Sequence, residues 1–113
     1  MRINCRDTGD TDYKEVSVFL QLSPEDLAKI AKISVKTVRF NDKMPEALKE
    51  RIDEMKNVCE LVYEMLGEVI KTQLWFKTKN QMLGNNSPRD LLRFGRYQKL
   101  LDILLDIKNG NVP

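Results

Sequence analysis

The spacing of apolar residues predicts helices along almost the whole chain. The longest pattern follows Met44-Pro45, where apolar residues recur every three or four positions and form one stripe along a helix. The members of this stripe are Leu48, Ile52, Met55, Cys59, Val62 and Leu66. A coiled-coil dimer is the alternative interpretation, but the stripe runs for only about three heptads and has no consistent leucine position. We therefore expect this helix to pack inside a core.

Two short segments before the long helix carry helix-start signals, after a first short helix over 13–20. In Ser23-Pro24-Glu25-Asp26 the serine can cap, the proline suits the first helical position, and the acid completes an approximate capping box. A second start at Ser34 predicts another helix over 34–40. Two short helices joined by about three residues have the layout of a helix–turn–helix. Lys32 stands in the turn, where a positive φ costs a non-glycine residue roughly 1 kcal/mol.

The helix predicted over 34–40 is the candidate for DNA contact. Its outward-facing residues are Ser34, Lys36, Thr37 and Arg39. In a helix–turn–helix these side chains would enter the major groove or contact phosphates. Lysine-rich helices are also ordinary solvated faces, and the sequence leaves both interpretations open.

The C-terminal part predicts three shorter helices. The first begins at Val69, ends in Lys77-Thr78-Lys79-Asn80, and leads into a loop in which Gly84 and Asn85 permit a tight turn. Ser87-Pro88-Arg89-Asp90 repeats the earlier start signal, and Gly95 ends the short helix that it opens. The last helix runs over 96–108 and stops at Asn109-Gly110.

Composition excludes most catalytic chemistry. The chain has no histidine, only two cysteines and five scattered glycines, so it lacks histidine-based triads, zinc sites and glycine-rich phosphate loops. We therefore expect no enzyme activity, no cofactor and no metal. No apolar run approaches the ~20 residues that a membrane helix needs, and the polar N-terminus has no secretion signal. Cys5 and Cys59 are too few for a disulfide framework, which predicts a reduced, cytoplasmic protein.

Two stretches resemble a known family. LSPEDLAKIAKISVKTVR resembles the Xre-type repressor helix–turn–helix, except that Lys32 replaces the usual glycine. WFKTKNQMLGNNSPRDLLRFGRYQKLLDIL resembles the toxin-binding domain of Xre/MbcA/ParS-like antitoxins, with Lys79 where a proline usually precedes Asn80. The resemblance covers roughly 13–110, and its specificity comes from the ordered set of positions rather than from any single one.

The resemblance implies an all-α fold in which an Xre-like helix–turn–helix bundle is joined by a long helix to a small toxin-binding domain. The expected division is a flexible segment over 1–12, the helix–turn–helix with its connecting helix over 13–66, the toxin-binding domain over 67–110, and a tail over 111–113.

The implied function is that of an antitoxin in a type II toxin–antitoxin system. Members of this family silence a RES-type toxin that degrades NAD or an ADP-ribosyltransferase-like toxin, are typically homodimers, and often repress their own operon by binding operator DNA. Their C-terminal end reaches the toxin's active-site entrance in several cases. A stand-alone regulator whose C-terminal domain only dimerises is the alternative.

The resemblance also suggests where a toxin would bind. Arg89, Arg93, Arg96 and Lys99 offer a basic rim for an acidic partner. Family analogy alone adds Lys108, Asn109 and Gly110 at the end of the last helix.

Overall fold

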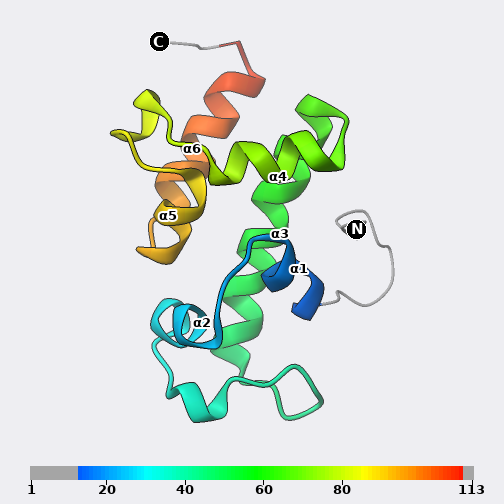
Figure 1. Ribbon diagram of the computed structural model, residues 1–113, viewed down its shortest axis with the longest axis vertical. Coiled ribbons are helices and arrows are strands. Elements are labelled where there is room, and N and C mark those ends of the chain that lie inside the picture. The colour runs from blue at the N-terminus through cyan, green and yellow to red at the C-terminus, as the bar shows by residue number, and fades with distance from the viewer. Residues whose placement is uncertain (1–12, 111–113) are drawn as a thin grey trace.

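The structure, a computed structural model, describes residues 13–110, and every regular element in this range is a helix (Figure 1). In chain order these are α1 (Tyr13–Phe19), α2 (Pro24–Ala31), the 3-10 turn η1 (Val35–Thr37), α3 (Glu46–Leu66), α4 (Val69–Lys77), the 3-10 turn η2 (Gln81–Leu83), α5 (Pro88–Arg93) and α6 (Tyr97–Lys108). The predicted all-α class is confirmed. The expected flexible segment over 1–12 and the tail over 111–113 lie outside the described residues.

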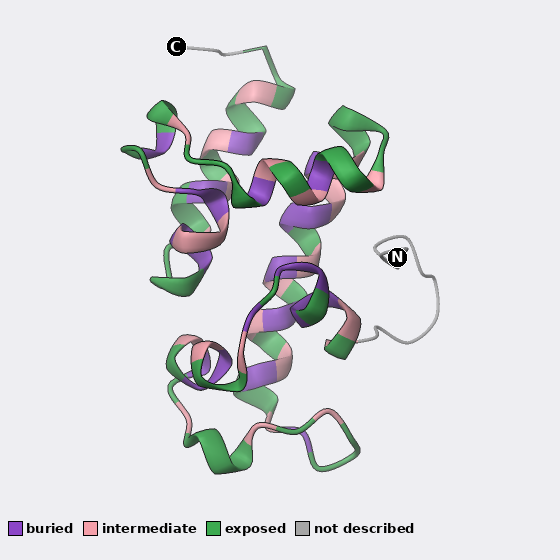
Figure 2. Ribbon diagram, in the orientation of Figure 1, coloured by how far each residue is buried: buried purple, intermediate pink, exposed green. Residues whose placement is uncertain are grey.

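The long helix α3 is the axis on which the other helices pack. It contacts α1 and α2 along its first half, and α4 and α6 along its second. The predicted stripe explains this position, because its members from Leu48 to Val62 are all buried (Figure 2). Leu66 is the exception, since 39% of it is exposed. We expected it in the core, but Leu66 is the last residue of α3, where the helix is only partly covered.

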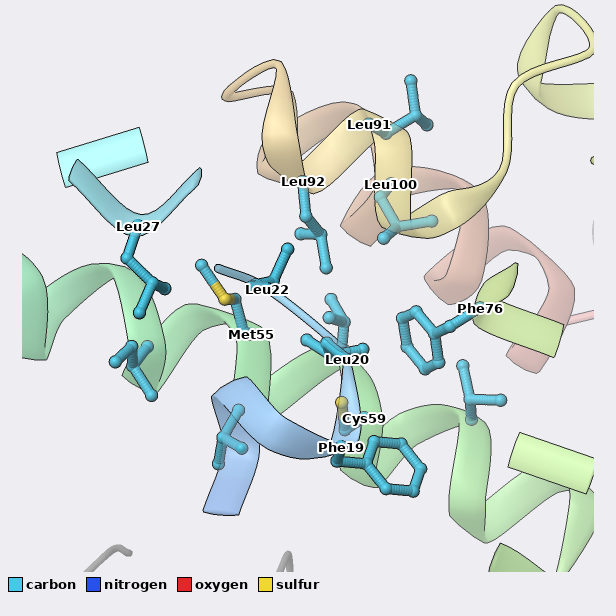
Figure 3. Packing of buried hydrophobic residues seen from close by; sticks show 14 of the residues in the cluster. Phe19, Leu20, Leu22, Leu27, Met55, Cys59, Phe76, Leu91, Leu92 and Leu100 are labelled. Atoms are coloured by element: carbon cyan, nitrogen blue, oxygen red, sulfur yellow. The ribbon is translucent and has the colours of Figure 1, made fainter. Parts of the chain in front are cut away.

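One hydrophobic core joins the N-terminal and C-terminal helices. Leu20, Leu22 and Leu27 come from the N-terminal part, and Figure 3 shows Leu20 and Leu22 near Leu92 and Leu100 of the C-terminal part. Met55 and Cys59 of α3 and Phe76 of α4 belong to the same cluster. The segments over 13–66 and 67–110 therefore share a single core in the described structure.

The prediction of a second short helix over 34–40 was wrong. Only Val35–Thr37 forms a single 3-10 turn, and residues 38–40 have no regular structure. Three of the six residues after Ser34 are β-branched and lose side-chain freedom in a helix. So short a helix also needs tertiary burial to persist, yet Val35 is 44% exposed. The described chain therefore lacks the recognition helix of a helix–turn–helix.

The start and end of α2 agree with prediction. Ser23 Oγ accepts from the Asp26 amide at 3.1 Å, and Asp26 Oδ2 accepts from the Ser23 amide at 3.0 Å, which completes the capping box. Lys32 adopts φ 58° and ψ 47°, the left-handed conformation expected at this turn. The Ile33 amide then donates to the Ala28 carbonyl at 2.9 Å and closes the helix end.

The loop before α5 is held by asparagine hydrogen bonds. Asn80 Oδ1 accepts from the Met82 amide at 2.9 Å, and an isolated bridge pairs Asn80 with Asn86. Gly84 adopts φ 68°, and Asn85 adopts φ 64°. This closed loop places Ser87, whose Oγ accepts from the Asp90 amide at 3.1 Å and starts α5.

Candidate interaction surface

An apolar groove lies between the ends of α3 and α6, with α4 beside it. It has a volume of about 200 Å³, and its lining is Val62, Met65, Leu66, Trp75, Leu104 and Ile107. Every lining side chain is hydrophobic, so the groove provides no acid, base or nucleophile. It suits an apolar side chain of another molecule rather than a reacting substrate.

The groove lies where the last turns of α3 and α6 meet the side of α4. The final turn of α3 carries Met65 and Leu66, each 39% exposed, just before Gly67 turns the chain with φ 70°. Trp75 is half-buried on α4 and meets the buried Phe76 edge-on, with ring centroids 5.1 Å apart. Phe76 belongs to the core, whereas Trp75 contributes one wall of the groove.

Further apolar side chains are exposed on α4. Ile70 is 72% exposed and Leu74 is 61% exposed, four residues apart on one helix face. The opposite face buries Thr72 and Phe76 against the core. The sequence analysis assigned Ile70 and Leu74 to a short helix without identifying the exposed face that they share.

The structure gives Arg89 and Arg93 intramolecular partners. Arg89 Nε and Nη2 donate to the carbonyls of Leu20 and Gln21, both at 2.6 Å. Arg93 pairs with Asp26 and with Asp90, each at 3.2 Å. These two predicted toxin contacts therefore join α5 to α2 and to the link between α1 and α2, a role that sequence reasoning did not foresee.

Asp26 of α2 is the carboxylate that Arg93 of α5 contacts. Burial raises its pKa, but hydrogen bonds from the Ser23 amide and hydroxyl, together with the Arg93 guanidinium, outweigh burial. The pKa of Asp26 is therefore lowered from its usual 3.8, and the carboxylate stays charged at neutral pH.

The remaining predicted toxin contacts fall into two separate places. Arg96 and Lys99 lie exposed at the start of α6 and have no ion pair with any residue in 13–110. Lys108, Asn109 and Gly110 are exposed at the other end of that helix, roughly 15 Å away at the helical rise. Lys108 lies 3.8 Å from Glu64, beside the groove. Only this second group adjoins the groove.

The predicted DNA contacts lie at the opposite end of the molecule. Ser34, Lys36 and Thr37 belong to η1 and its cap, Arg39 follows in irregular chain, and all four are exposed. Thr37 Oγ1 donates to the Ser34 carbonyl at 2.7 Å, and Ser34 Oγ accepts from the Lys36 amide at 3.3 Å. The two hydroxyl groups thus stabilise the turn, while the two cations extend from its surface.

The described residues contain no cluster of histidine, cysteine or carboxylate side chains that could hold a metal ion. Within 13–110, no helix is both long and apolar enough to cross a membrane.

Comparison with known proteins identifies similar chains. Over 98 residues the chain is 28% identical to the mycobacterial cidal antitoxin MbcA of Mycobacterium tuberculosis, a match that spans 87% of this chain and 80% of MbcA. MbcA of Mycobacterium bovis matches with the same values. A chain in the crystal structure of the M. tuberculosis MbcT-MbcA toxin-antitoxin complex has the same fold, with a TM-score of 0.59 and 22% identity over 90% of this chain and 95% of that chain. No protein-family profile matches the sequence.

Proposed function

We propose that this protein is an antitoxin that binds a cognate toxin directly and silences it. The observation that carries the proposal is the apolar groove beside Lys108, Asn109 and Gly110, in a chain similar to MbcA along most of its length. Apolar side chains that are exposed together, rather than singly, are typical of a surface that binds another protein. Residues 69–113 carry eight Lys or Arg against three Asp or Glu, which favours an acidic partner.

The toxin's chemistry belongs to the same proposal. The resemblance in sequence favours a toxin that consumes NAD or transfers ADP-ribose, either RES-type or ADP-ribosyltransferase-like. The end of α6 is the part of the chain that would reach such a toxin's active-site entrance, because it is polar and adjoins the groove.

Co-expression with the product of the adjacent reading frame tests the antitoxin proposal. We expect that product to arrest growth alone and this chain to restore growth and co-purify with it. A harmless neighbour, or toxicity that persists in the presence of this chain, contradicts the proposal.

A pair of near-isosteric substitutions tests the groove itself. Met65→Gln places an amide in the groove with little change in shape, so we expect at least a ten-fold loss of toxin affinity. Val35→Thr makes the same kind of change at an exposed apolar residue on η1, at the far end of the molecule, and should leave the affinity unchanged. Equal effects of the two substitutions would place the toxin elsewhere.

Operator binding and homodimer formation are further parts of the proposal. Exposed Lys36 and Arg39 support phosphate contacts, although they extend from a turn rather than from a recognition helix. If Lys36 meets a phosphate, Lys36→Gln lowers the slope of log affinity against log salt by about one. A flat salt response contradicts phosphate contact. Promoter binding that Arg39→Ala abolishes, with no partner co-purified, would favour a stand-alone regulator instead.

A further inference from the structure

Sulfur is the one oxidisable element in the described chain, and its exposure is uneven. The sulfur-containing residues in 13–110 are Met44, Met55, Cys59, Met65 and Met82. The first three are buried, at most 6% exposed. Met65 is 39% exposed and Met82 is 41% exposed. An oxidant in solution can therefore reach these two methionines without any opening of the core.

The two exposed methionines lie in different surroundings. Met65 is in the last turn of α3 and lines the apolar groove, whose other lining side chains are all hydrophobic. Met82 belongs to the 3-10 turn η2 and does not line the groove. Oxidation of Met65 therefore changes the proposed toxin contact, whereas oxidation of Met82 changes a surface outside the groove.

The reaction at Met65 is the two-electron oxidation of a thioether by a hydroperoxide. The sulfur atom attacks one peroxide oxygen, so that an S–O bond forms while the O–O bond breaks. The proton on the transferred oxygen passes to the departing one. The sulfur is oxidised to a sulfoxide, and hydrogen peroxide is reduced to water. The product carries a polar oxygen on a side chain that was apolar.

This oxygen affects binding more than folding. In the free chain Met65 is partly exposed, so the sulfoxide keeps its contact with water and the fold changes little. A partner that covers the groove removes that water and leaves the oxygen among mainly aliphatic side chains. Burying a polar group without a hydrogen bond is unfavourable. The sulfoxide therefore weakens binding for the same reason as Met65→Gln.

We propose that Met65 is an oxidation site through which a hydroperoxide lowers the affinity of this chain for its toxin. The inference rests on the proposed toxin contact at the apolar groove. Because a bound toxin would cover Met65, oxidation acts on the free chain and the complex protects it. A methionine sulfoxide reductase reverses the change.

Peroxide treatment of the full chain tests the reactivity of Met65. The chain is incubated with hydrogen peroxide, catalase stops the reaction, and peptide mass spectrometry measures the sulfoxide at each methionine. We expect Met65 and Met82 to be oxidised at least ten-fold faster than Met44 and Met55. A rate at Met65 as low as that of the two buried methionines overturns the proposal.

Two variants that each keep one exposed methionine test the effect on binding. Each is oxidised alone and then mixed with the product of the adjacent reading frame. Oxidised Met82→Leu, which keeps Met65, should bind at least ten-fold more weakly than before oxidation and recover after reductase treatment. Met65→Leu keeps the groove apolar, so its affinity should not change on oxidation.

The outcomes separate this inference from the proposed function. Full affinity in oxidised Met82→Leu overturns the role of Met65 alone. An equal loss in oxidised Met65→Leu also overturns it, because the effect then lies elsewhere. Loss of helicity on oxidation, measured by circular dichroism, overturns it too, since the change would then act on folding. If the untreated chain does not bind that product at all, the proposed function fails and this inference fails with it.

Discussion

Two helices that contact each other, α2 and α5, begin with the same signature. Ser23-Pro24-Glu25-Asp26 opens α2 and Ser87-Pro88-Arg89-Asp90 opens α5. In both, the serine hydroxyl accepts from the aspartate amide at 3.1 Å. The next residue is buried in each case, as Leu27 and Leu91. The same local residues therefore produce the same backbone start twice.

The side chains of the two starts have different partners. Both aspartates pair with Arg93 at 3.2 Å, but Asp26 also accepts from the amide of its own capping residue, Ser23. Glu25 is exposed, while Arg89 in the equivalent position reaches the carbonyls of Leu20 and Gln21. The comparison teaches that a capping signature sets the backbone, whereas the neighbouring elements decide what its charged side chains bind.

Truncation of the buried leucine that follows each signature, Leu27 or Leu91, should have the largest effect on stability. Leu27→Ala and Leu91→Ala each remove a side chain that is at most 1% exposed, so we expect each to lower the free energy of unfolding by about 2–5 kcal/mol. Urea denaturation measures both. A small loss at only one of the two sites would show that the two helices do not share one core.

The third residue of each signature, Glu25 in α2 and Arg89 in α5, should contribute very differently to stability. Arg89→Ala removes two hydrogen bonds from a charged group to backbone carbonyls, so we expect a loss of about 1.5–3 kcal/mol in the free energy of unfolding. Glu25→Ala is the matched control and should leave stability nearly unchanged, because Glu25 is exposed. Equal losses in urea denaturation would remove the distinction between the two starts.

The two serine caps should contribute nearly equally to stability at neutral pH. Ser23→Ala and Ser87→Ala should each lower the free energy of unfolding by about 1 kcal/mol in urea denaturation.

The stability that Asp26 provides should depend on pH. Because the folded pKa of Asp26 is lowered, its contribution to stability is present above its usual pKa of 3.8 and is lost as the pH falls through the folded value. Asp26→Asn should therefore flatten the decline in stability below about pH 4. An unchanged decline in this variant would mean that other groups cause it.

Substitutions at the ends of the two helices should have the smallest effect on stability. Lys32 with φ 58° ends α2, and Gly95 with φ 74° ends α5. We expect Lys32→Gly to stabilise the protein, and Gly95→Ala to destabilise it, each by about 1 kcal/mol, because the strain lies in the backbone. A Cβ at Gly95 would have no heavy atom within 4 Å, so no clash confuses the result. Thermal unfolding gives both values, and changes of the same sign would contradict the explanation.

Much of the fold was predictable from local signals. The stripe in α3, the two capping serines and the positive φ at Lys32 are each encoded within a few neighbouring residues, and all are present in the structure. The helix over 34–40 was not predictable in this way. Its capping serine is real, but a cap does not supply the burial that so short a helix needs.

The candidate site was less predictable than the fold. Counting charges selected Arg89, Arg93, Arg96 and Lys99 as one rim, yet two of them have intramolecular partners. The apolar groove was missed because Leu66 continues the spacing of the buried stripe on α3. Whether an apolar side chain is covered depends on which element lies opposite, and spacing along one helix carries no such information.

Local sequence signals account for the all-helical class, the starts of α2 and α5, the end of α2, and the buried face of α3, because these follow from hydrogen bonds and periodicities that span a few residues. The tertiary structure is needed to see that α2 and α5 meet through Arg93 and Asp26, and that the ends of α3 and α6 leave an apolar groove beside α4. Both features join residues more than 30 positions apart: Asp26 and Arg93 form an ion pair, and Val62 and Leu104 line the same groove. Their physical origin is the packing of whole helices around one core, which no short segment encodes.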